Sequence, residues 1–336
     1  MLRNTAYCLL KRKKMTVGYI GGSVTAGFGA SNAEVTSWRA RTTQWLREAF
    51  PAATVTEGNA AVGGTGSFLG MCRIGTALLE PYHPDLIFIE YAINDYYQGC
   101  SMEESARQME SMVRQCLSAN PYTDIVPVYT TDCGVAGRDF DAVRAFEQVA
   151  RHYGLYTVNV GRLLREREGA DALRYQGRFL TDSVHPNDTG YERYAAYVTE
   201  FLDAQLAEAP DAPRAHCVPA PLYSDLVTSA RPIGAVDMAA ANPGVGNLYD
   251  ETNYVLGSGE AMHTRFCGCT LALWWRMATG GQVMLTLDSE SSALPVGNPD
   301  GAHRQLYTGL SNDEHILTVA NTGVVDCSLR SLYILQ

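Results

Sequence analysis

The feature that most constrains the fold is an alternation of two hydrophobic patterns between residues 16 and 206. Short, almost continuous apolar runs alternate with longer stretches whose apolar residues recur at helical spacing. Continuous apolar runs are typical of strands buried on both faces, and helices between them indicate a parallel α/β sheet. The predicted strands are 16–20, 54–57, 86–90, 125–129 and 156–159, and the predicted helices are approximately 38–50, 68–80, 103–119, 140–152 and 190–206.

A second domain is expected from the length of the chain and from a change in its composition. The 336 residues suit two domains of ordinary size. Residues 209–221 hold four prolines, which is typical of an extended connection. We therefore predict an α/β domain over 1–208, a linker over 209–221 and a smaller all-β sandwich over 222–336. The strand-like runs of that sandwich are 269–275, 282–287, 314–319 and 328–335.

Charge and hydropathy exclude several classes of partner. The formal net charge of −10 opposes binding to nucleic acid, so we interpret the basic tetrad Lys11–Lys14 as a solvated start of the chain. Apolar residues precede this tetrad, which reverses the order of a signal peptide and leads us to expect a cytoplasmic protein. No segment has the long uncharged apolar run of a membrane span. The sequence does not indicate an oligomeric state.

The nine cysteines predict neither a metal site nor a disulfide framework. Their number is odd and they lack paired C-x-x-C spacing, so free buried thiols are expected. Cys267 and Cys269 would face the same side of a strand, and metal or redox chemistry there is the alternative. We assign no metal and no cofactor.

Ser23 lies where an open α/β sheet places its ligands. The strand 16–20 continues directly into Gly21-Gly22-Ser23, so Ser23 is expected at the carboxyl end of a parallel strand. The two glycines allow a sharp turn, and a phosphate-binding turn would use them equally well. The glycines of this region do not form G-x-G-x-x-G, and no Walker lysine follows, which argues against nucleotide binding.

A base for this hydroxyl is offered by Asp182 and His185. Asp182 and His185 are three residues apart, so in a tight turn the carboxylate and the imidazole can lie on the same side of the turn. Pro186 restricts the backbone of His185. The alternative is an Asp that caps the turn beside an exposed His. A serine needs such a base and a group that orients it, so the three residues together predict a catalytic triad. The closing glycine of the G-x-S-x-G elbow is missing, which argues against an α/β-hydrolase scaffold.

Four short blocks in order resemble the motifs of the SGNH, or GDSL-type, hydrolase family. They are Gly21–Ser23, Asn59–Gly64, Ala92–Asp95 and Asp182–His185. The resemblance covers nearly the whole first domain and implies a flavodoxin-like α/β/α fold with a parallel sheet. It also implies a carboxylic ester hydrolase that works through an acyl-enzyme without a cofactor.

The resemblance implies a role for five residues. Ser23 would be the nucleophile, His185 the general base and then acid, and Asp182 its orienting partner. The oxyanion hole would consist of the backbone N–H groups of Ser23 and Gly64 and the side-chain amide of Asn94. A glycine allows close approach of the main chain, and Asn94 supplies a neutral donor above the sheet.

The sequence departs from the family pattern at two positions. The usual Gly-Asp-Ser has Gly22 in its centre, and the usual Gly-x-Asn-Asp begins with Ala92. Neither position supplies catalytic atoms. Asp95 is open to interpretation as a second acid, and we interpret it instead as a hydrogen-bonding residue that fixes the Asn94 loop.

The substrate class is inferred from aromatic residues. The β-rich region resembles the jelly-roll modules of some carbohydrate esterases. There, Trp274 and Trp275 are adjacent, so one of them would face outward for stacking on a sugar, unless both serve packing. Trp38, Tyr91 and Tyr96 are expected to line the cleft beside Ser23.

The predicted function is removal of O-acetyl groups from carbohydrates such as acetylated manno- or xylo-oligosaccharides. The substrate partner would be an acetylated oligosaccharide, with no nucleic acid and no membrane involved. Two alternatives are a lysophospholipase or thioesterase on the same triad, and a glycan-binding protein whose esterase site is vestigial.

Overall fold

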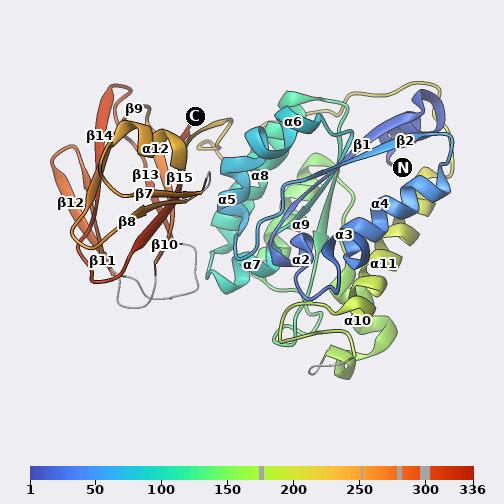
Figure 1. Cartoon of the computed structure of the whole chain (residues 1–336). Helices are drawn as coiled ribbons and strands as arrows, with labels where there is room; N and C mark the ends of the chain where they lie inside the picture. Colours follow the sequence, from blue (N-terminus) through green and yellow to red (C-terminus); the bar gives the residue numbers. More distant parts are fainter. Residues whose placement is uncertain (174–177, 251–252, 278–281, 296–302) are drawn as a thin grey trace. The chain divides into compact units, whose positions relative to one another are not determined.

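The central sheet of the first unit is built from the five predicted apolar runs (Figure 1). The computed structural model describes residues 1–173, 178–250, 253–277, 282–295 and 303–336. The strands are all parallel in the order β2-β1-β3-β4-β5, so the flavodoxin-like prediction is confirmed. Their bounds are β1 Lys14–Gly21, β2 Thr54–Asn59, β3 Leu86–Glu90, β4 Asp124–Tyr129 and β5 Val158–Asn159.

Helices cover both faces of this sheet and complete three layers. Helices α4 and α11 pack together on one face, and α5, α8 and α9 pack together on the other (Figure 1). The five long helices follow the predicted ranges: α4 Trp38–Ala49, α5 Ser67–Ile74, α8 Met102–Ala119, α9 Asp141–Tyr153 and α11 Asp188–Leu206. The shorter helices are α1 Arg3–Tyr7, α2 Ser23–Ala26, α3 Ala33–Thr36, α6 Glu80–Tyr82, α7 Ala92–Tyr97 and α10 Val160–Glu168.

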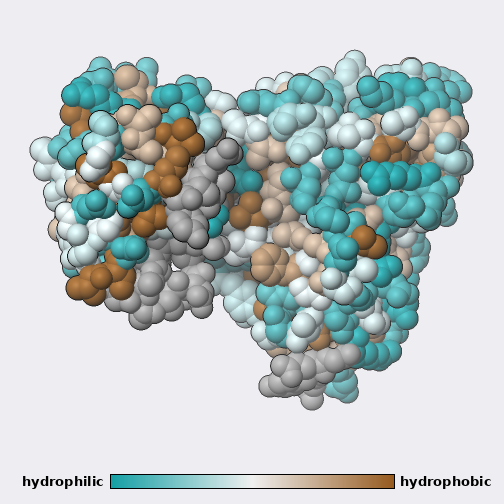
Figure 2. Space-filling view, in the orientation of Figure 1, coloured by the Kyte–Doolittle hydropathy of each residue, from teal (hydrophilic) through white to brown (hydrophobic). Residues whose placement is uncertain are grey.

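Local sequence explains where these helices begin and which side they bury. Helix α8 begins with a capping box, in which Ser101 Oγ accepts the Glu104 N–H and the Glu104 carboxylate accepts the Ser101 N–H. Its apolar stripe includes the buried Met109 and Val113, four positions apart. In Figure 2 the surface over α4 is mainly hydrophilic, as expected of a helix that buries one face only. No helix within the described ranges is long and apolar enough to span a membrane.

The proline-rich segment follows the surface of the first unit instead of leaving it. Asn4 forms two hydrogen bonds with the backbone of Arg214, and His216 Nε2 lies 2.9 Å from Asp124 Oδ1. Compact packing divides the chain into Met1–Leu226 and Val227–Gln336, so residues 209–221 group with the first unit. The segment has no helix or strand, and side chains of the first unit anchor its backbone.

The second unit is an antiparallel β-sandwich, as predicted. One sheet has the order β13-β10-β15-β8-β7, with β6 also on β15, and the other has the order β12-β11-β14-β9. Apolar residues from both sheets and from α12 (Ala235–Ala241) form its core. The strands are β6 Ala230–Gly234, β7 Asn247–Asp250, β8 Asn253–Leu256, β9 Ala261–Cys267, β10 Thr270–Met277, β11 Gln282–Leu287, β12 Glu290–Pro295, β13 His303–Tyr307, β14 Glu314–Asn321 and β15 Cys327–Leu335.

All nine cysteines are free thiols, but the expectation that they are buried holds only in part. Cys8, Cys72, Cys116 and Cys327 are buried, whereas Cys217, Cys267 and Cys269 are exposed. Burial raises the pKa of Cys8 to about 12 and that of Cys327 to about 12, which keeps these thiols protonated at neutral pH.

Candidate active site

The turn between β1 and α2 places Ser23 at the carboxyl edge of the sheet. Ser23 is the first residue of α2, and its side chain is largely buried. Gly21 has no room for a side chain, because an added Cβ would lie 2.4 Å from Thr25 Oγ1 and 2.7 Å from the Glu90 carbonyl oxygen. Gly22 is extended, with φ −84° and ψ −153°. The two glycines therefore let the chain turn from strand into helix against β3.

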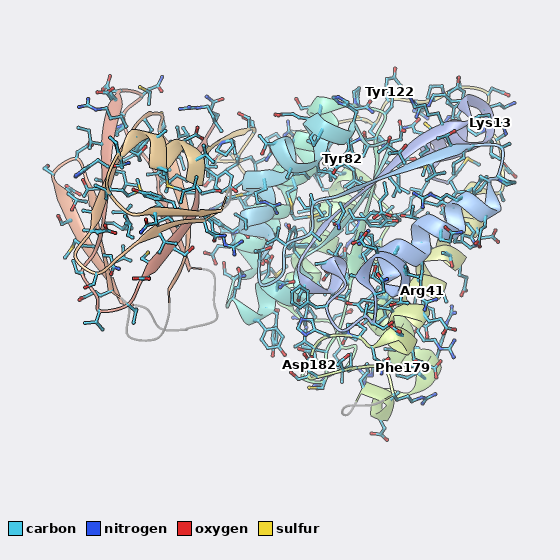
Figure 3. The ribbon with its side chains drawn as sticks, viewed as in Figure 1. Lys13, Arg41, Tyr82, Tyr122, Phe179 and Asp182 are labelled. Atoms are coloured by element: carbon cyan, nitrogen blue, oxygen red, sulfur yellow. The ribbon has the colours of Figure 1, made fainter. Side chains whose placement is uncertain are left out.

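Asp182 and His185 share one loop, which follows Phe179 and leads into α11; Figure 3 labels Asp182 and Phe179. Asp182 Oδ1 accepts the N–H groups of Val184 and His185, both at 2.7 Å, so the carboxylate closes the turn itself. Its Oδ2 lies 2.7 Å from His185 Nδ1. On the other side of the ring, Nε2 lies 2.8 Å from Ser23 Oγ, although the two residues are 162 positions apart.

The electrostatics of the hydrogen-bonded residues Ser23, His185 and Asp182 suit proton transfer. Partial burial acts to raise the pKa of the Asp182 carboxyl, but hydrogen bonds from His185 and from the backbone N–H groups outweigh it and hold the pKa below its ordinary value. Asp182 is therefore ionised at neutral pH. A carboxylate on Nδ1 leaves Nε2 free to take the proton of the Ser23 hydroxyl and stabilises the imidazolium that results.

The glycine block runs beside the end of β1. The Val62 N–H donates to the Gly21 carbonyl at 3.0 Å, which fixes the block to the nucleophile strand. A Cβ added to Gly63 would lie 3.6 Å from Ser23 Cβ, so this main chain passes next to the serine. Gly64 follows with φ +74°, a conformation that favours glycine.

The asparagine block begins α7 and lies directly over Gly22. A Cβ added to Gly22 would lie 2.1 Å from Asn94 Oδ1 and 2.8 Å from Nδ2, so the Asn94 amide occupies the space of a side chain at position 22. Asp95 is fully buried and accepts hydrogen bonds from the N–H and the hydroxyl of Ser67, at 2.8 and 2.6 Å. Asp95 thus ties the Asn94 turn to the start of α5, which fits its interpretation as a hydrogen-bonding residue.

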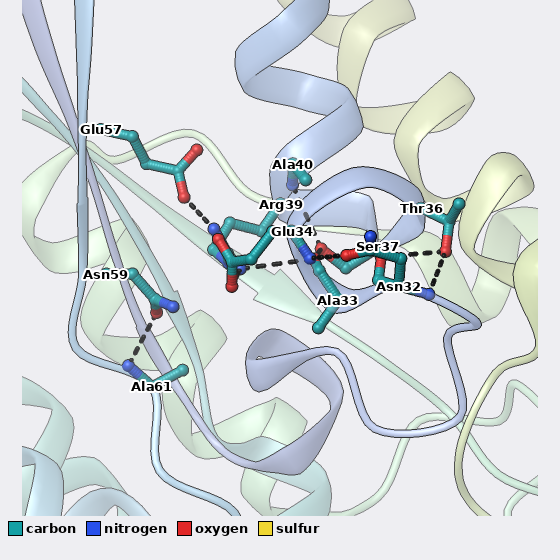
Figure 4. A network of polar contacts seen from close by, with 10 residues as sticks. All are labelled: Asn32, Ala33, Glu34, Thr36, Ser37, Arg39, Ala40, Glu57, Asn59 and Ala61. Atoms are coloured by element: carbon teal, nitrogen blue, oxygen red, sulfur yellow. Dashed lines mark hydrogen bonds and ion pairs between the residues drawn. The ribbon is translucent and has the colours of Figure 1, made fainter.

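A buried arginine with two carboxylate partners holds the segment between Ser23 and the glycine block (Figure 4). Arg39 is 1% exposed and donates to Glu34, at 2.7 Å, and to Glu57 near the end of β2. Two residues after Glu57, Asn59 Oδ1 accepts the Ala61 N–H at 3.0 Å and starts the turn into the glycine block. Arg39 therefore connects α3 and α4 to the strand that leads to Gly64.

Two of the predicted substrate contacts are wrong. Trp38 is buried and packs edge-on against Tyr19, with ring centroids 5.4 Å apart, and Tyr91 is buried with no exposed surface. Neither ring can reach a sugar from the interior of the first unit. Tyr96, by contrast, is 46% exposed.

The two predicted tryptophans of the second unit belong to β10. The pairing of β10 with β15 shifts register between Trp274 and Trp275. Their side chains lie outside the described part of the structure, so the predicted stacking stays a prediction.

Sequence reasoning missed Phe28, an aromatic residue next to the serine. The residue is 57% exposed, its ring lies 5.8 Å from the His185 ring, and the ring edge lies 3.1 Å from a Cβ added to Gly63. The signal was Gly27, with φ +93°, which ends α2 and turns the next residue out of the helix.

No group of three or more His, Cys, Asp or Glu residues that would suit a metal ion occurs within the described ranges.

Comparisons with known proteins identify related sequences and folds. Residues 19–193 match the model of the GDSL-like lipase/acylhydrolase family, a range that includes all four blocks. No curated protein sequence matches the chain. A crystal structure of a two-domain esterase active on acetylated mannans covers 100% of this chain and 96% of its own, at 21% identity and a TM-score of 0.81. A structure of such an esterase co-crystallised with mannopentaose covers 98% and 93%, at 21% identity and a TM-score of 0.78. At this identity, the likeness shows that both units share their folds with these esterases.

Proposed function

The chain belongs to the GDSL-like lipase/acylhydrolase family, and from this premise we propose that it is a serine esterase that removes O-acetyl groups from carbohydrates. The observation that carries the proposal is the hydrogen-bonded chain from Ser23 through His185 to Asp182. It joins a hydroxyl, a base and an orienting carboxylate at the carboxyl edge of a parallel sheet.

Acylation follows from this geometry. Ser23 Oγ attacks the carbonyl carbon of the ester, while His185 Nε2 takes the hydroxyl proton. The ionised Asp182 stabilises the imidazolium. The oxyanion receives hydrogen bonds from the N–H groups of Ser23 and Gly64 and from the Asn94 amide. When the intermediate collapses, the bond to the sugar oxygen breaks, that oxygen takes the proton from Nε2, and the acetyl group stays on Oγ.

Deacylation repeats the same steps with water. His185 takes a proton from a water molecule, the hydroxide attacks the acetyl carbon, and the second oxyanion forms in the same place. Acetate leaves as the bond to Oγ breaks, and Ser23 regains its proton from His185. The chemistry balances with ester and water as the only reactants.

A carbohydrate as the alcohol part of the ester is supported by two observations. Phe28 is exposed and its ring lies beside that of His185, and aromatic faces suit the apolar face of a pyranose. The solved structures with the same two folds are described as esterases active on acetylated mannans. We therefore propose acetylated manno- or xylo-oligosaccharides as the substrate, with Phe28 beside the alcohol part.

The test measures acetyl groups lost from a panel of acetylated oligosaccharides by mass spectrometry. Wild-type protein should release acetate, and Ser23→Ala should release none above background. Ser118→Ala, at an exposed serine on α8, is the matched control and should act like wild type. Faster turnover of long-chain esters than of acetyl esters would favour a lysophospholipase or thioesterase instead. Sugar binding without any turnover would favour a vestigial site.

A further inference from the structure

A buried carboxylic acid lies directly under the nucleophile turn, and the reaction above does not use it. Glu90 is the last residue of β3 and has no exposed surface. Its Oε2 accepts the Thr25 hydroxyl at 2.8 Å, and its Oε1 accepts the Thr130 hydroxyl at 2.8 Å. Its carbonyl oxygen accepts the N–H of Gly22 at 3.2 Å. Through these hydrogen bonds Glu90 connects Gly22 and Thr25, which flank Ser23, to Thr130 at the end of β4.

The surroundings of this carboxyl are polar but neutral. Thr25 faces it from α2 and Thr130 from the end of β4, and three phenols are close enough to feel its charge. These are Tyr191 and Tyr194 of α11 and the neighbouring Tyr91, and burial raises the pKa of each, so they stay uncharged. Burial of a carboxylate among neutral groups costs stability, so structure alone does not account for an acid here.

Resting on the proposed role of Ser23 as nucleophile, we propose that Glu90 is a positioning residue whose ionised carboxylate, through Thr25 and Thr130, holds the first turn of α2 in the reactive geometry. A carboxylate accepts hydrogen bonds only, which matches two hydroxyl donors, one on each oxygen. Thr25 is two residues after Ser23, so this contact fixes the turn that carries both the Ser23 hydroxyl and its N–H. A shift of this turn would displace the nucleophile and one oxyanion donor together.

The proposal has a pH signature. Burial raises the pKa of Glu90 to about 7, against hydrogen bonds from Thr130, Thr25 and the backbone that lower it. Below this pH one oxygen carries a proton, and the neutral carboxyl accepts more weakly from the Thr25 and Thr130 hydroxyls, so the hydrogen bonds that hold the first turn of α2 weaken. Activity should therefore rise as Glu90 ionises, in addition to the ionisation of the catalytic base. The folded protein favours the protonated acid, so Glu90 makes the protein less stable as the pH rises towards 7.

The experiment measures kcat/KM for 4-nitrophenyl acetate from pH 5 to 9, with thermal unfolding on the same samples. Glu90→Gln keeps the shape but cannot ionise. It should lower kcat about tenfold with KM within about twofold, and its profile should lose one of the two ionisations. At pH 8 it should unfold at no lower temperature than wild type, because it removes a buried charge. Glu110→Gln, which changes a fully buried carboxyl on α8, is the matched control and should keep the wild-type profile.

A second variant tests the hydrogen bond between Glu90 and Thr25 if Glu90→Gln does not fold. Thr25→Val removes one hydrogen bond that lowers the pKa of Glu90, so the second ionisation should move to higher pH. A wild-type profile in Glu90→Gln, or no movement in Thr25→Val, overturns the proposal while Ser23 remains the nucleophile. Turnover that survives Ser23→Ala overturns the proposed function itself, so the two failures are distinguishable.

Discussion

Replacement of Gly22 by alanine should displace the Asn94 oxyanion donor while leaving the sequence of the triad and of Asn94 unchanged. The backbone at Gly22 has a φ open to any residue, so the change adds no strain of its own. The added Cβ would instead lie 2.1 Å from Asn94 Oδ1, 2.7 Å from its Cγ and 2.8 Å from Nδ2. The whole amide must retreat, because each of these contacts is shorter than two packed atoms allow.

The size of the effect follows from these distances. An ordinary contact begins at 3.4 Å, so the Asn94 oxygen must move by about 1.3 Å. Such a displacement takes the amide away from the oxyanion. Loss of one oxyanion donor lowers kcat by about two to three decades, or roughly 2.7–4 kcal/mol of transition-state stabilisation. We expect Gly22→Ala to lower kcat by this factor, with a small change in KM.

The assay is steady-state hydrolysis of an acetyl ester by four proteins: wild type, Gly22→Ala, Asn94→Ala and the double variant. If alanine at 22 acts through Asn94, the double variant should be no slower than Asn94→Ala, which is a strongly non-additive result. Gly75→Ala is the matched control, since an added Cβ there meets no atom closer than 3.9 Å. Wild-type kcat in Gly22→Ala, or additive losses in the double variant, would refute the reasoning.

Three further predictions concern substrate, pH and thiols. Phe28→Ala should raise KM for an acetylated oligosaccharide about tenfold and leave triacetin unchanged, because one aromatic contact is worth about 1 kcal/mol or more; equal losses on both substrates would contradict a sugar contact. The Ser311 carbonyl and the Asp288 carboxylate accept hydrogen bonds from the two ring nitrogens of His315 and raise its pKa. The protonated His315 therefore stabilises the folded protein fully below about pH 6.5, and this contribution is lost as the pH rises through the raised pKa. Thermal unfolding from pH 6 to 9 should show this loss in wild type and not in His315→Gln. A thiol reagent should label the exposed cysteines of the native protein at once and the four buried ones only after unfolding; early labelling of a buried thiol would contradict the packing. The exposed set is Cys217, Cys267 and Cys269.

The fold was predictable because its information is local. Each strand of the first sheet is a short apolar run and each long helix an apolar stripe, so periodicity alone located them. Strand β5 is the exception: it ends where predicted but begins at Val158, two residues later than the apolar pattern indicates. The linker prediction reflected proline content, whereas the hydrogen bonds from Asn4 to Arg214 that fix its path join residues 210 positions apart.

The candidate site was predictable where residues act within one turn. Asp182 and His185 are three apart, and a single loop brings them together. A motif does not determine whether a neighbouring aromatic side chain points into the cleft or into the core. For this reason the prediction that Trp38 and Tyr91 line the cleft is wrong, and both side chains are buried in the interior. Glu90 offered a signal that was overlooked, namely an acid at the end of the continuous apolar strand β3.

The central claim is that Ser23 is the nucleophile and His185 its base. A fluorophosphonate that reacts with activated serines tests this claim most directly, with the modified residue located by peptide mass spectrometry. We predict one adduct per chain, on Ser23, with loss of activity in proportion to labelling and no adduct in His185→Ala. An adduct on another residue, or full labelling of Ser23 with activity intact, would contradict the account.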